Sequence, residues 1–407
     1  MTNVLQITYN AFGGGAGRAA RRIHEAVGRS GIESTLHCAR WMTAGRRRRI
    51  ASKLYYGMRA RAEAAINLLM KTPNPSPRWT ASLPSNWAAS INSSRFDLVH
   101  LHWICGGMMS IEDIGRINKP IVWTMHDMWA FCGSENLADD DRYAKGYRRN
   151  NRPRGETGLD LHGWTWRRKH RSWTGGFQVV APSRWMKACI NRSCLMHEWP
   201  VEVVPNPIDT DKWCPQPRAQ ARAALAIEND ACVLCVAGID GPVSRHKGYD
   251  LLNDALAAMP HGRQITLLVI GHPGGWQPVI PGVTIRFLGF VSEDEALRRA
   301  YCAADAMVVP SRIDNLPNTA VEAASCGLPV AAFDVGGLPD IVEHRVSGYL
   351  ARPFDVDDLA RGIGWVLDAT KDGRAGRAAR SCAVERFEMS RIGIRYSALY
   401  DAVLART

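Results

Sequence analysis

Two carboxylates stand eight positions apart in the segment SRIDNLPNTAVEAASCG, residues 311–327. Asp314 lies in a polar stretch before a predicted helix, and Glu322 lies within that helix, which Pro317 is suited to begin and Gly327 to end. Backbone N–H groups at the start of a helix attract an anion, and carboxylates accept hydrogen bonds from hydroxyl groups. The combination is typical of a site for a sugar nucleotide, although an ordinary turn followed by a solvated helix would use the same residues.

A second segment, VAGIDGPVSRHKGYDLL at residues 236–252, is predicted to be a strand, a glycine-bearing loop and a helix. The loop carries Arg245 and Lys247, and two cations at the entry to a helix suit a diphosphate. Such a loop is a weak signal by itself. Its place in the same half of the chain as Asp314 and Glu322 strengthens the prediction of a sugar-nucleotide site.

The elements that would position these residues follow one pattern throughout the chain. A predicted strand at Val4–Tyr9 leads into a glycine-rich loop and a helix, and apolar strands then alternate with helices in both halves. This alternation predicts an α/β fold with parallel sheets. We expect two Rossmann-like, doubly wound domains that face each other across a cleft, at residues 1–205 and 206–387, with a C-terminal helix within 388–407 that returns to the first domain.

Several motifs occur together in the order that one enzyme family shows. The spacing from Asp314 to Glu322 resembles the E-x7-E motif of the retaining family 4 glycosyltransferases, which have the GT-B fold. The segments WTMHDMWAFCG and SRIDN are similar to those of bacterial exopolysaccharide glycosyltransferases of the colanic acid type. The further segments that carry the resemblance, over nearly the whole chain, are GGGAGRAARRIHEAVGRSGIES, HLHW, VVPNPID, HKGYDLL and LPNTAVEAASCGLPVAAFDVGGLPDIV.

The resemblance implies a hexosyltransferase that moves a sugar from a UDP- or GDP-linked donor to a glycan or a polyprenyl-diphosphate-linked acceptor, with retention at the anomeric carbon, in exopolysaccharide or cell-surface polysaccharide biosynthesis. Lys247 and Arg245 would neutralise the donor diphosphate, and Glu322 would accept hydrogen bonds from the ribose. Asp314 would contact the donor sugar, and His126 would lie near the reacting sugar from the other domain. The remaining implied donor-binding residues are Gly14, Gly15, Leu288, Phe290, Asn315, Leu316, Asn318 and Thr319.

The chain departs from the family pattern at three places. Asp314 stands where the family usually has Glu, and Asp240 and Gly241 occupy the place of the family's usual arginine. Of the cysteine-rich patch that follows the HDxW motif in related exopolysaccharide enzymes, only Cys132 remains. We therefore expect no metal at this patch, and no cofactor besides the sugar nucleotide itself.

Other candidate metal ligands have plainer interpretations. Asp139–Asp141 lie in a polar loop, whereas the metal-binding carboxylates of the other major glycosyltransferase fold should end an apolar strand. Cys232 and Cys235 lie in a predicted buried strand, without a second cysteine pair at zinc spacing. His100 and His102 share one face of a strand, where either cleft lining or ordinary packing would place them. We predict a metal-independent enzyme.

Charge is unevenly distributed along the 407 residues. Residues 1–200 hold 30 Lys/Arg and 14 Asp/Glu, which gives +16, and the remaining residues hold 21 and 25, which gives −4. Arg46–Arg49 precede apolar residues at helical spacing, which predicts either a helix lying on an anionic membrane or one packed on its own domain. The segment LHGWTWRRKHRSW, residues 161–173, is the other candidate for membrane or acceptor contact. The apolar residues at helical spacing are Leu54, Met58, Ala62, Ile66 and Leu69.

The N-terminal segment MTNVLQITYN lacks the basic start and apolar core of a secretory signal, and the longest apolar stretches fall short of a membrane span. We expect a cytoplasmic protein with peripheral contact to the inner face of the cell membrane. Two other functions fit parts of the pattern. A nucleotide-sugar epimerase of GT-B architecture would turn over its substrate without an acceptor. A basic nucleic-acid-binding protein is disfavoured by the acidic second half, so we expect no nucleic acid partner.

Overall fold

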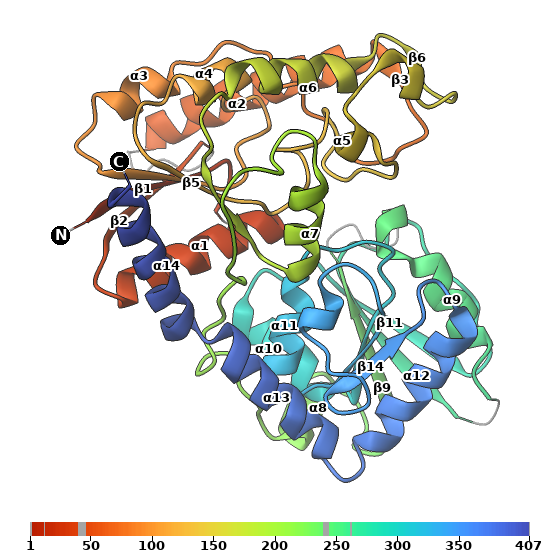
Figure 1. The fold of residues 1–407 in the computed structure, drawn as a ribbon. Helices are drawn as coiled ribbons and strands as arrows, with labels where there is room; N and C mark the ends of the chain where they lie inside the picture. The colour runs from red at the N-terminus through yellow and green to blue at the C-terminus, as the bar shows by residue number, and fades with distance from the viewer. Residues whose placement is uncertain (1, 12, 40–45, 239–243, 261–262, 407) are drawn as a thin grey trace. The chain divides into compact units, whose positions relative to one another are not determined.

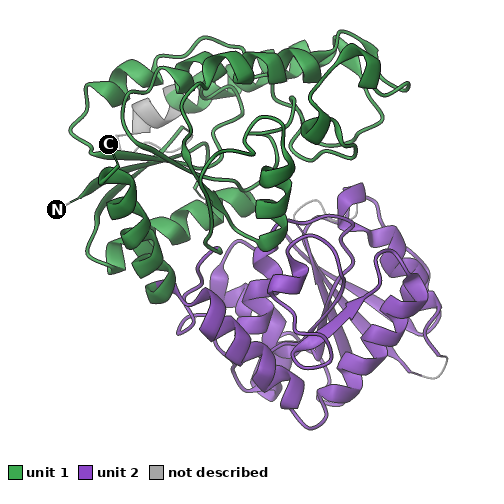
Figure 2. Cartoon of the chain, viewed as in Figure 1, with its two compact units in different colours: residues 1–205, 390–407 green, residues 206–389 purple. Residues whose placement is uncertain are grey.

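The computed structural model describes residues 2–11, 13–39, 46–238, 244–260 and 263–406, with side chains from residue 52 in the helix that begins at Arg46. The chain divides into two compact units (Figures 1 and 2). Unit 1 comprises residues 1–205 and 390–407, and unit 2 comprises residues 206–389. The sequence placed the corresponding boundaries after residues 205 and 387.

Unit 1 is built around a six-stranded parallel sheet with the strand order β2-β1-β4-β5-β7-β8. Its strands are β1 (Asn3–Thr8), β2 (Glu33–Cys38), β4 (Leu98–Leu101), β5 (Ile121–Thr124), β7 (Gln178–Ala181) and β8 (Val201–Val203), and β3 (Met70–Lys71) pairs antiparallel with β6 (Thr157–Gly158). Its helices are α1 (Gly14–Arg29), α2 (Arg46–Asn67), α3 (Trp87–Asn92), α4 (Ile111–Gly115), α5 (Arg142–Lys145), the 3₁₀ turn η1 (Arg149–Asn151), α6 (Leu161–Ser172) and α7 (Arg184–Arg192).

The C-terminal helix α14 (Met389–Leu404) completes unit 1, as predicted (Figure 1). Its buried residues Ile392, Tyr396 and Tyr400 share an apolar cluster with residues of the sheet and of α1. Gly393 permits close packing of α14 on α1, because a Cβ atom at this position would lie 2.2 Å from the carbonyl oxygen of Ala26. The last segment of the chain is therefore part of the first unit's core.

Unit 2 contains a second six-stranded parallel sheet, with the order β11-β10-β9-β12-β13-β14. Its strands are β9 (Cys232–Ala237), β10 (Ile265–Ile270), β11 (Val283–Gly289), β12 (Ala306–Val309), β13 (Val330–Phe333) and β14 (Gly348–Ala351). Its helices are α8 (Arg218–Ala224), the 3₁₀ turn η2 (Arg245–Lys247), α9 (Tyr249–Ala257), α10 (Asp294–Ala303), α11 (Asn318–Ser325), the 3₁₀ turn η3 (Leu338–Asp340), α12 (Val356–Ala369) and α13 (Arg374–Phe387).

The central strands of unit 2 are buried on both faces. Along β9, Val233 and Cys235 belong to one apolar cluster, whereas Leu234 and Val236 belong to another. Cys232 packs against the second cluster and Cys235 against the first, so the two thiols point to opposite faces of the sheet. This arrangement confirms their interpretation as core residues.

Each sheet has one point at which the direction of strand addition reverses. In unit 2 the chain adds β10 on one side of β9 and later adds β12 on the other side, so the loops that follow β9 and β12 leave the sheet next to each other. In unit 1 the same relationship holds for β1, β2 and β4. Ligands of doubly wound sheets bind at such switch points, beyond the carboxyl ends of the strands.

Candidate functional site

Lys247 and Asp314 meet at the switch point of unit 2. Lys247 ends the turn η2 in the loop after β9, and Asp314 lies in the loop between β12 and α11. The Lys247 Nζ atom lies 2.5 Å from Asp314 Oδ2, and the hydroxyl of Ser311 lies 3.4 Å from the same oxygen. The two loops that the sequence marked as phosphate and sugar sites therefore form one site, with a cation and an anion in contact.

A second ion pair ties the same two loops together. Arg312 donates to both carboxylate oxygens of Asp250, at 2.6 Å each, and its backbone N–H donates to the carbonyl of His246 at 2.8 Å. Gly248 between them has φ of +66°, and a Cβ atom there would lie 2.0 Å from the carbonyl oxygen of Pro310. Only glycine fits this close approach of the loops, and the sequence alone did not reveal the contact.

A third loop, after β13, supports the backbone of Asp314. The Gly337 N–H donates to the Asp314 carbonyl at 3.0 Å. Gly336 has φ of +59°, and a Cβ atom at this position would lie 2.0 Å from the same oxygen. The two glycines of the VGGLP segment thus hold the candidate carboxylate in place, a role that sequence reasoning missed although the glycine pair was visible.

Helix α11 begins beside this ion pair. Pro317 is its N-cap residue, one position earlier than the predicted first turn, and Gly327 with φ of +75° follows its end as predicted. Asn315 and Leu316 are buried, whereas Asn318 and Thr319 are partly exposed in the first turn. Asn318 Oδ1 accepts a hydrogen bond from Asn206 Nδ2 at 3.3 Å.

Glu322 lies deeper than its predicted ribose contact suggests. Its side chain is fully buried within α11, and Oε2 accepts a hydrogen bond from the Tyr301 hydroxyl at 3.1 Å. Asp314, by contrast, keeps part of its side chain at the surface. The donor roles of both carboxylates remain predictions.

The other predicted residues of unit 2 differ in exposure. Arg245 is exposed at the start of η2. Leu288 is partly buried against the apolar core, and Phe290 is half exposed with its ring parallel to that of His272. Asp240 and Gly241, which occupy the place of the family's usual arginine, lie outside the described residues.

In unit 1, α1 begins at the switch point with two exposed glycines, Gly14 and Gly15. Gly14 has φ of +74°, and no atom lies within 4 Å of the place where its Cβ would be. Gly17 instead provides the tight contact of this loop, since a Cβ there would lie 1.8 Å from the Asn10 carbonyl oxygen. The start of α1 therefore leaves backbone accessible, as the predicted approach of a ligand would require.

His126 follows β5 and belongs to a chain of polar side chains. Its Nε2 atom lies 3.2 Å from Nδ1 of His102, whose Nε2 lies 3.0 Å from Gln6 Oε1. Burial lowers the pKa of His126 to about 4. His126 is consequently a neutral imidazole at pH 7, able to exchange hydrogen bonds with a sugar hydroxyl.

His100 is a packing residue. It is fully buried, with Nδ1 2.7 Å from the Tyr400 hydroxyl and Nε2 2.8 Å from Thr124 Oγ1. Its ring lies 4.1 Å from that of His102, centroid to centroid. His100 therefore packs against α14.

The loop after His126 is held by two charged residues that sequence reasoning did not identify. Asp127 accepts hydrogen bonds from the Trp103 indole at 2.9 Å and from the Trp129 N–H at 3.0 Å, and burial raises its pKa to about 6. Lys169 is fully buried and donates to the carbonyls of Trp129, Cys132 and Gly133. Burial lowers the pKa of Lys169 to about 7.

The three consecutive aspartates have local partners. Asp139 accepts a hydrogen bond from Asn74, Asp140 caps the N–H of Arg142, and Asp141 forms an ion pair with Lys145. Within the ranges that the structure describes, no cluster of three or more His, Cys, Asp or Glu side chains has an arrangement that could hold a metal ion.

Two family models match this chain. Residues 13–212 match the family model described as Glycosyltransferase Family 4, and residues 231–369 match that of Glycosyl transferases group 1. A D-inositol 3-phosphate glycosyltransferase of Mycobacterium sp. (strain KMS) is 36% identical over 197 residues, which are 46% of this chain and 42% of that protein. The chain thus spans less than half the length of this curated relative.

Two solved structures share the fold over the whole chain. The sucrose-phosphate synthase of Thermosynechococcus elongatus aligns with a TM-score of 0.66 at 18% identity and covers 100% of both chains. The HepE protein of Anabaena, solved in complex with UDP-glucose, aligns with a TM-score of 0.65 at 18% identity over 99% of this chain and 100% of its own. These structures show the GT-B fold, and the two family models show that the chain belongs to the family 4 glycosyltransferases.

Proposed function

We propose that the protein is a retaining glycosyltransferase that moves a hexose from a nucleotide-sugar donor to a glycan or lipid-linked acceptor in the synthesis of a cell-surface polysaccharide. The observation that carries this proposal is the contact between Lys247 and Asp314 beside the start of α11. A cation for a diphosphate and a carboxylate for sugar hydroxyls are thereby placed together, at the switch point of a doubly wound sheet.

The chemistry assigned to unit 2 is stabilisation of a leaving diphosphate. Lys247, exposed Arg245 and the N–H groups of the first turn of α11 would bind the phosphate oxygens on which negative charge accumulates. The acceptor oxygen would form a bond to the anomeric carbon on the face from which the phosphate oxygen departs. The departing phosphate oxygen would take the acceptor's proton, which balances the transfer and retains the anomeric configuration.

Asp314 would change partner when the donor binds. The diphosphate competes with Asp314 for the ammonium group of Lys247, because both ligands are anionic. Once Lys247 turns to the diphosphate, Asp314 is able to accept hydrogen bonds from the donor sugar. Neutral His126, on unit 1, would supply a further hydrogen-bonding group for the reacting sugar.

The related proteins support a nucleotide-linked donor. HepE was solved with UDP-glucose, and the mycobacterial relative is named for glycosyl transfer to an inositol phosphate. We therefore assign a UDP- or GDP-linked sugar as donor. The cations of the protein would stabilise the diphosphate without a metal ion, since Asp139–Asp141 are already bound by neighbouring side chains and backbone.

An acceptor at a membrane surface is supported by the way α2 packs in unit 1. The helix is fastened by polar contacts: Glu63 accepts hydrogen bonds from the N–H groups of Thr80 and Ser82, and Arg59 donates to the Gly107 carbonyl. The apolar residues that recur at helical spacing form a stripe that remains at the protein surface: Leu54 is 63% exposed and Met58 is 60% exposed. A helix that buries polar anchors and exposes apolar side chains is suited to lie in the interface of a bilayer.

The end of the same stripe opens onto a cavity of about 930 Å³. Its lining includes the apolar residues Ile66, Leu69, Leu159 and Trp164 and the cations Arg149, Arg152 and Arg167. Apolar walls with several arginines suit an amphiphile that has an anionic head, such as a polyprenyl-diphosphate-linked sugar. The predicted basic segment 161–173 contributes Arg167 to this cavity, whereas its Lys169 is buried and plays no part at the surface.

Arg46–Arg49, the predicted membrane-facing cluster, have side chains outside the described part of the structure. Among the helices that the structure describes, none is both long enough and apolar enough to cross a bilayer. We propose that the contact is peripheral and lies at the cytoplasmic face of the cell membrane.

Transfer assays would test the proposal. The protein is incubated with a panel of UDP- and GDP-hexoses, with either a polyprenyl-diphosphate-linked sugar or a water-soluble glycan as acceptor. NMR of the product reports the anomeric configuration. We expect transfer with retention. Conversion of a nucleotide sugar without any acceptor would support the epimerase alternative instead, and inversion at the anomeric carbon would contradict the mechanism.

A further inference from the structure

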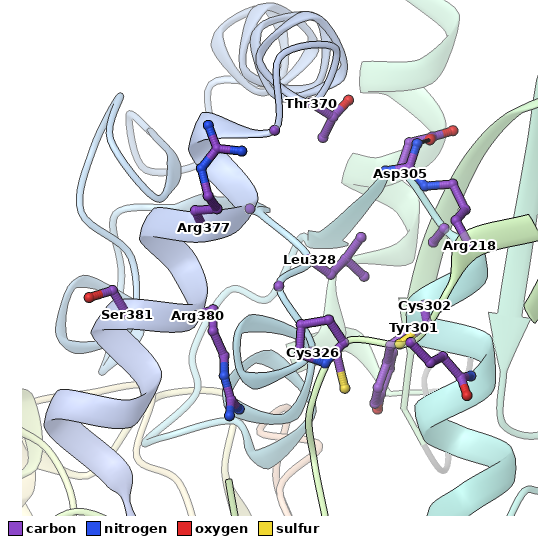
Figure 3. A pocket seen from close by; sticks show the side chains of 16 residues that line it. Arg218, Tyr301, Cys302, Asp305, Cys326, Leu328, Thr370, Arg377, Arg380 and Ser381 are labelled. Atoms are coloured by element: carbon purple, nitrogen blue, oxygen red, sulfur yellow. Dashed lines mark hydrogen bonds and ion pairs between the residues drawn. The ribbon is translucent and has the colours of Figure 1, made fainter. Parts of the chain in front are cut away.

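Unit 2 contains a cavity of about 460 Å³ at the end of the sheet opposite the Lys247–Asp314 site (Figure 3). Asp305 lines it and immediately precedes β12, and Leu328 lines it shortly before β13, so the cavity lies at the amino ends of these strands. The loop that carries Asp314 leaves the carboxyl end of β12. The volume falls in the range of pockets that hold small organic molecules.

Positive charge dominates the cavity wall. Figure 3 shows Arg377 and Arg380 on one side and Arg218 with Asp305 on the other, with Leu328 between them. Asp305 is the one carboxylate among the lining residues, and its oxygens already accept from Arg218 at 2.7 Å and from Arg222, behind the wall, at 2.9 Å. Arg218 and Arg222 therefore offset the negative charge of Asp305, and the charges of Arg377 and Arg380 come in addition.

Within the described ranges, the remaining two arginines form no close ion pair, and the nearby carboxylate of Asp372, whose charge Arg377 shares, is already paired with Arg374. Arg380 donates to the carbonyls of Trp213 at 2.7 Å, Ser325 at 2.9 Å and Thr210 at 2.8 Å. Among the residues that the structure describes, no carboxylate forms an ion pair with Arg377 or Arg380. Arginines therefore outnumber carboxylates around this hollow, which favours an anionic ligand.

One of the lining residues also carries a buried polar atom without an internal partner. The side-chain Nε2 of Gln216, one of the lining residues, is buried and donates to no acceptor in the described ranges. A buried amide donor without an acceptor is costly, and a ligand oxygen would satisfy it. The other walls are apolar, with Leu328 and the thiols of Cys302 and Cys326.

We propose that this cavity is a second ligand site, distinct from the donor site, for a small organic phosphate of the size of a sugar monophosphate. The phosphate group binds the guanidinium of Arg377 and lies within the positive field of Arg380. The sugar part fills the apolar hollow, where one of its oxygens accepts a hydrogen bond from Gln216. The observations that carry the proposal are the excess of arginines over carboxylates on the cavity wall and the unsatisfied amide of a lining residue.

The site is coupled to α11, the helix at whose other end the candidate donor site lies. Cys326 follows the last residue of α11, and Arg380 binds both the carbonyl and the hydroxyl of Ser325. Tyr301 lines the cavity and donates to Glu322 within the same helix. An anion that draws Arg380 toward itself therefore changes the support of α11, and with it the affinity for the donor; this coupling rests on the proposed function.

Calorimetric titration of the full chain with ribose 5-phosphate, and with ribose as the neutral control, tests the site. We expect binding of ribose 5-phosphate only. Arg377→Gln should weaken it roughly tenfold, because one charge-assisted contact is lost. Arg377 is exposed and its side chain donates to the Asp372 carbonyl at 3.3 Å, so the variant should fold. Arg361→Gln is the matched control, since Arg361 is an exposed arginine of the same unit that is paired with Asp358 and does not line the cavity.

A crossed control separates the two sites of unit 2. Lys247→Ala should weaken UDP binding but leave ribose 5-phosphate binding unchanged. Arg377→Gln should weaken ribose 5-phosphate binding but leave UDP binding unchanged. Absence of ribose 5-phosphate binding at millimolar concentration would overturn the proposal. Loss of binding in Lys247→Ala together with full binding in Arg377→Gln would also overturn it, because the phosphate would then occupy the donor site.

The coupling has its own measurement. Saturating ribose 5-phosphate should change the affinity for UDP, and UDP should change the affinity for ribose 5-phosphate by the same factor. Equal UDP affinity with and without the sugar phosphate would contradict the coupling. Because the ribose 5-phosphate titration needs neither donor nor acceptor, its failure is distinguishable from a failure of the proposed glycosyl transfer.

Discussion

The ammonium group of Lys247 lies 2.5 Å from the carboxylate of Asp314, although the two residues are 67 positions apart in the chain. Both side chains are partly exposed, at 35% and 16%, so the net stabilisation from their ion pair is small. A nucleotide diphosphate could therefore displace Asp314 from Lys247 at little cost. The pair keeps each side chain in position for its ligand while neutralising the other's charge.

The hydroxyl of Tyr301 should support both the fold and the donor site. Tyr301→Phe removes the donor to Glu322 and should lower the free energy of unfolding by about 1 kcal/mol, measured by denaturant titration. The same variant should weaken nucleotide-sugar binding, because Glu322 loses one of the contacts that hold it in α11.

Tyr349→Phe is a matched control for the Tyr301 variant. Tyr349 is also buried in unit 2 and donates to Asp358 at 2.9 Å, away from α11. This variant should lower stability by a similar amount without changing donor affinity. A parallel loss of donor affinity in both variants would show that the effect of Tyr301→Phe is a general loss of stability.

Acid should destabilise the protein through its buried histidines. Burial lowers the pKa of His126 from 6.5 to about 4 and holds the pKa values of His100 and His102 well below the usual range. At these histidines the unfolded chain binds more protons than the folded one in this window, so their contribution to stability is full above pH 6.5 and is lost as the pH falls toward 4. The raised pKa of Asp127, about 6, acts in the opposite direction and offsets part of the effect.

Thermal unfolding followed from pH 7 to pH 5 checks this expectation. His102→Gln should reduce the steepness of the loss, because one buried imidazole no longer has to stay neutral. His197→Gln, at an exposed position, should leave the steepness unchanged. Melting temperatures that do not depend on pH across this range would contradict the buried histidine chain.

Glycosyl transfer should not depend on a divalent metal. Lys247, Arg245 and the helix N–H groups are the proposed phosphate ligands, so activity should persist in excess chelator. The double variant Asp139→Asn with Asp141→Asn should keep its activity in the same assay. Complete loss of transfer on chelation, with recovery on addition of magnesium or manganese, would instead assign these aspartates to a metal.

The exposed stripe of α2 should bind anionic membranes. Leu54→Ser with Met58→Ser should lower the affinity for vesicles that contain anionic lipid, since both side chains are more than half exposed and would lose their apolar insertion. Ile394→Ser is the matched control, because Ile394 is equally exposed but lies on α14. Vesicle flotation at low salt measures the difference, and equal binding of all three proteins would remove α2 from the proposed membrane contact.

Much of the fold was predictable from the sequence, because apolar strands buried on both faces leave a clear pattern. The C-terminal helix predicted within residues 388–407 is present as α14, Met389–Leu404. The loops after β9 and β12 were identified as one site from their residue types alone. Their meeting followed from sheet topology, in which neighbouring strands bring their carboxyl ends together.

The details that hold the site were not predictable, because they depend on contacts between distant segments. Nothing near Arg312 indicated that it would bind Asp250, 62 positions away. Lys169 belongs to a basic segment that favoured a surface position, yet it is buried because three carbonyls of a distant loop surround its ammonium group. The apolar spacing in α2 likewise did not distinguish a helix that buries its apolar side chains from one that exposes them. In the structure these side chains are exposed, because polar contacts of Glu63 and Arg59 hold the helix on unit 1.

The most direct test of the account is titration of the protein with UDP- and GDP-hexoses, with Lys247→Ala beside the control Lys371→Ala. Lys371 is an exposed lysine of the same unit that forms an ion pair with Asp368. The account predicts that the unmodified protein and the control bind one nucleotide sugar with equal affinity, and that Lys247→Ala binds it roughly tenfold or more weakly, because a charge-assisted contact to the diphosphate is lost. Unchanged affinity in Lys247→Ala would contradict the assignment of the donor site to the Lys247–Asp314 pair.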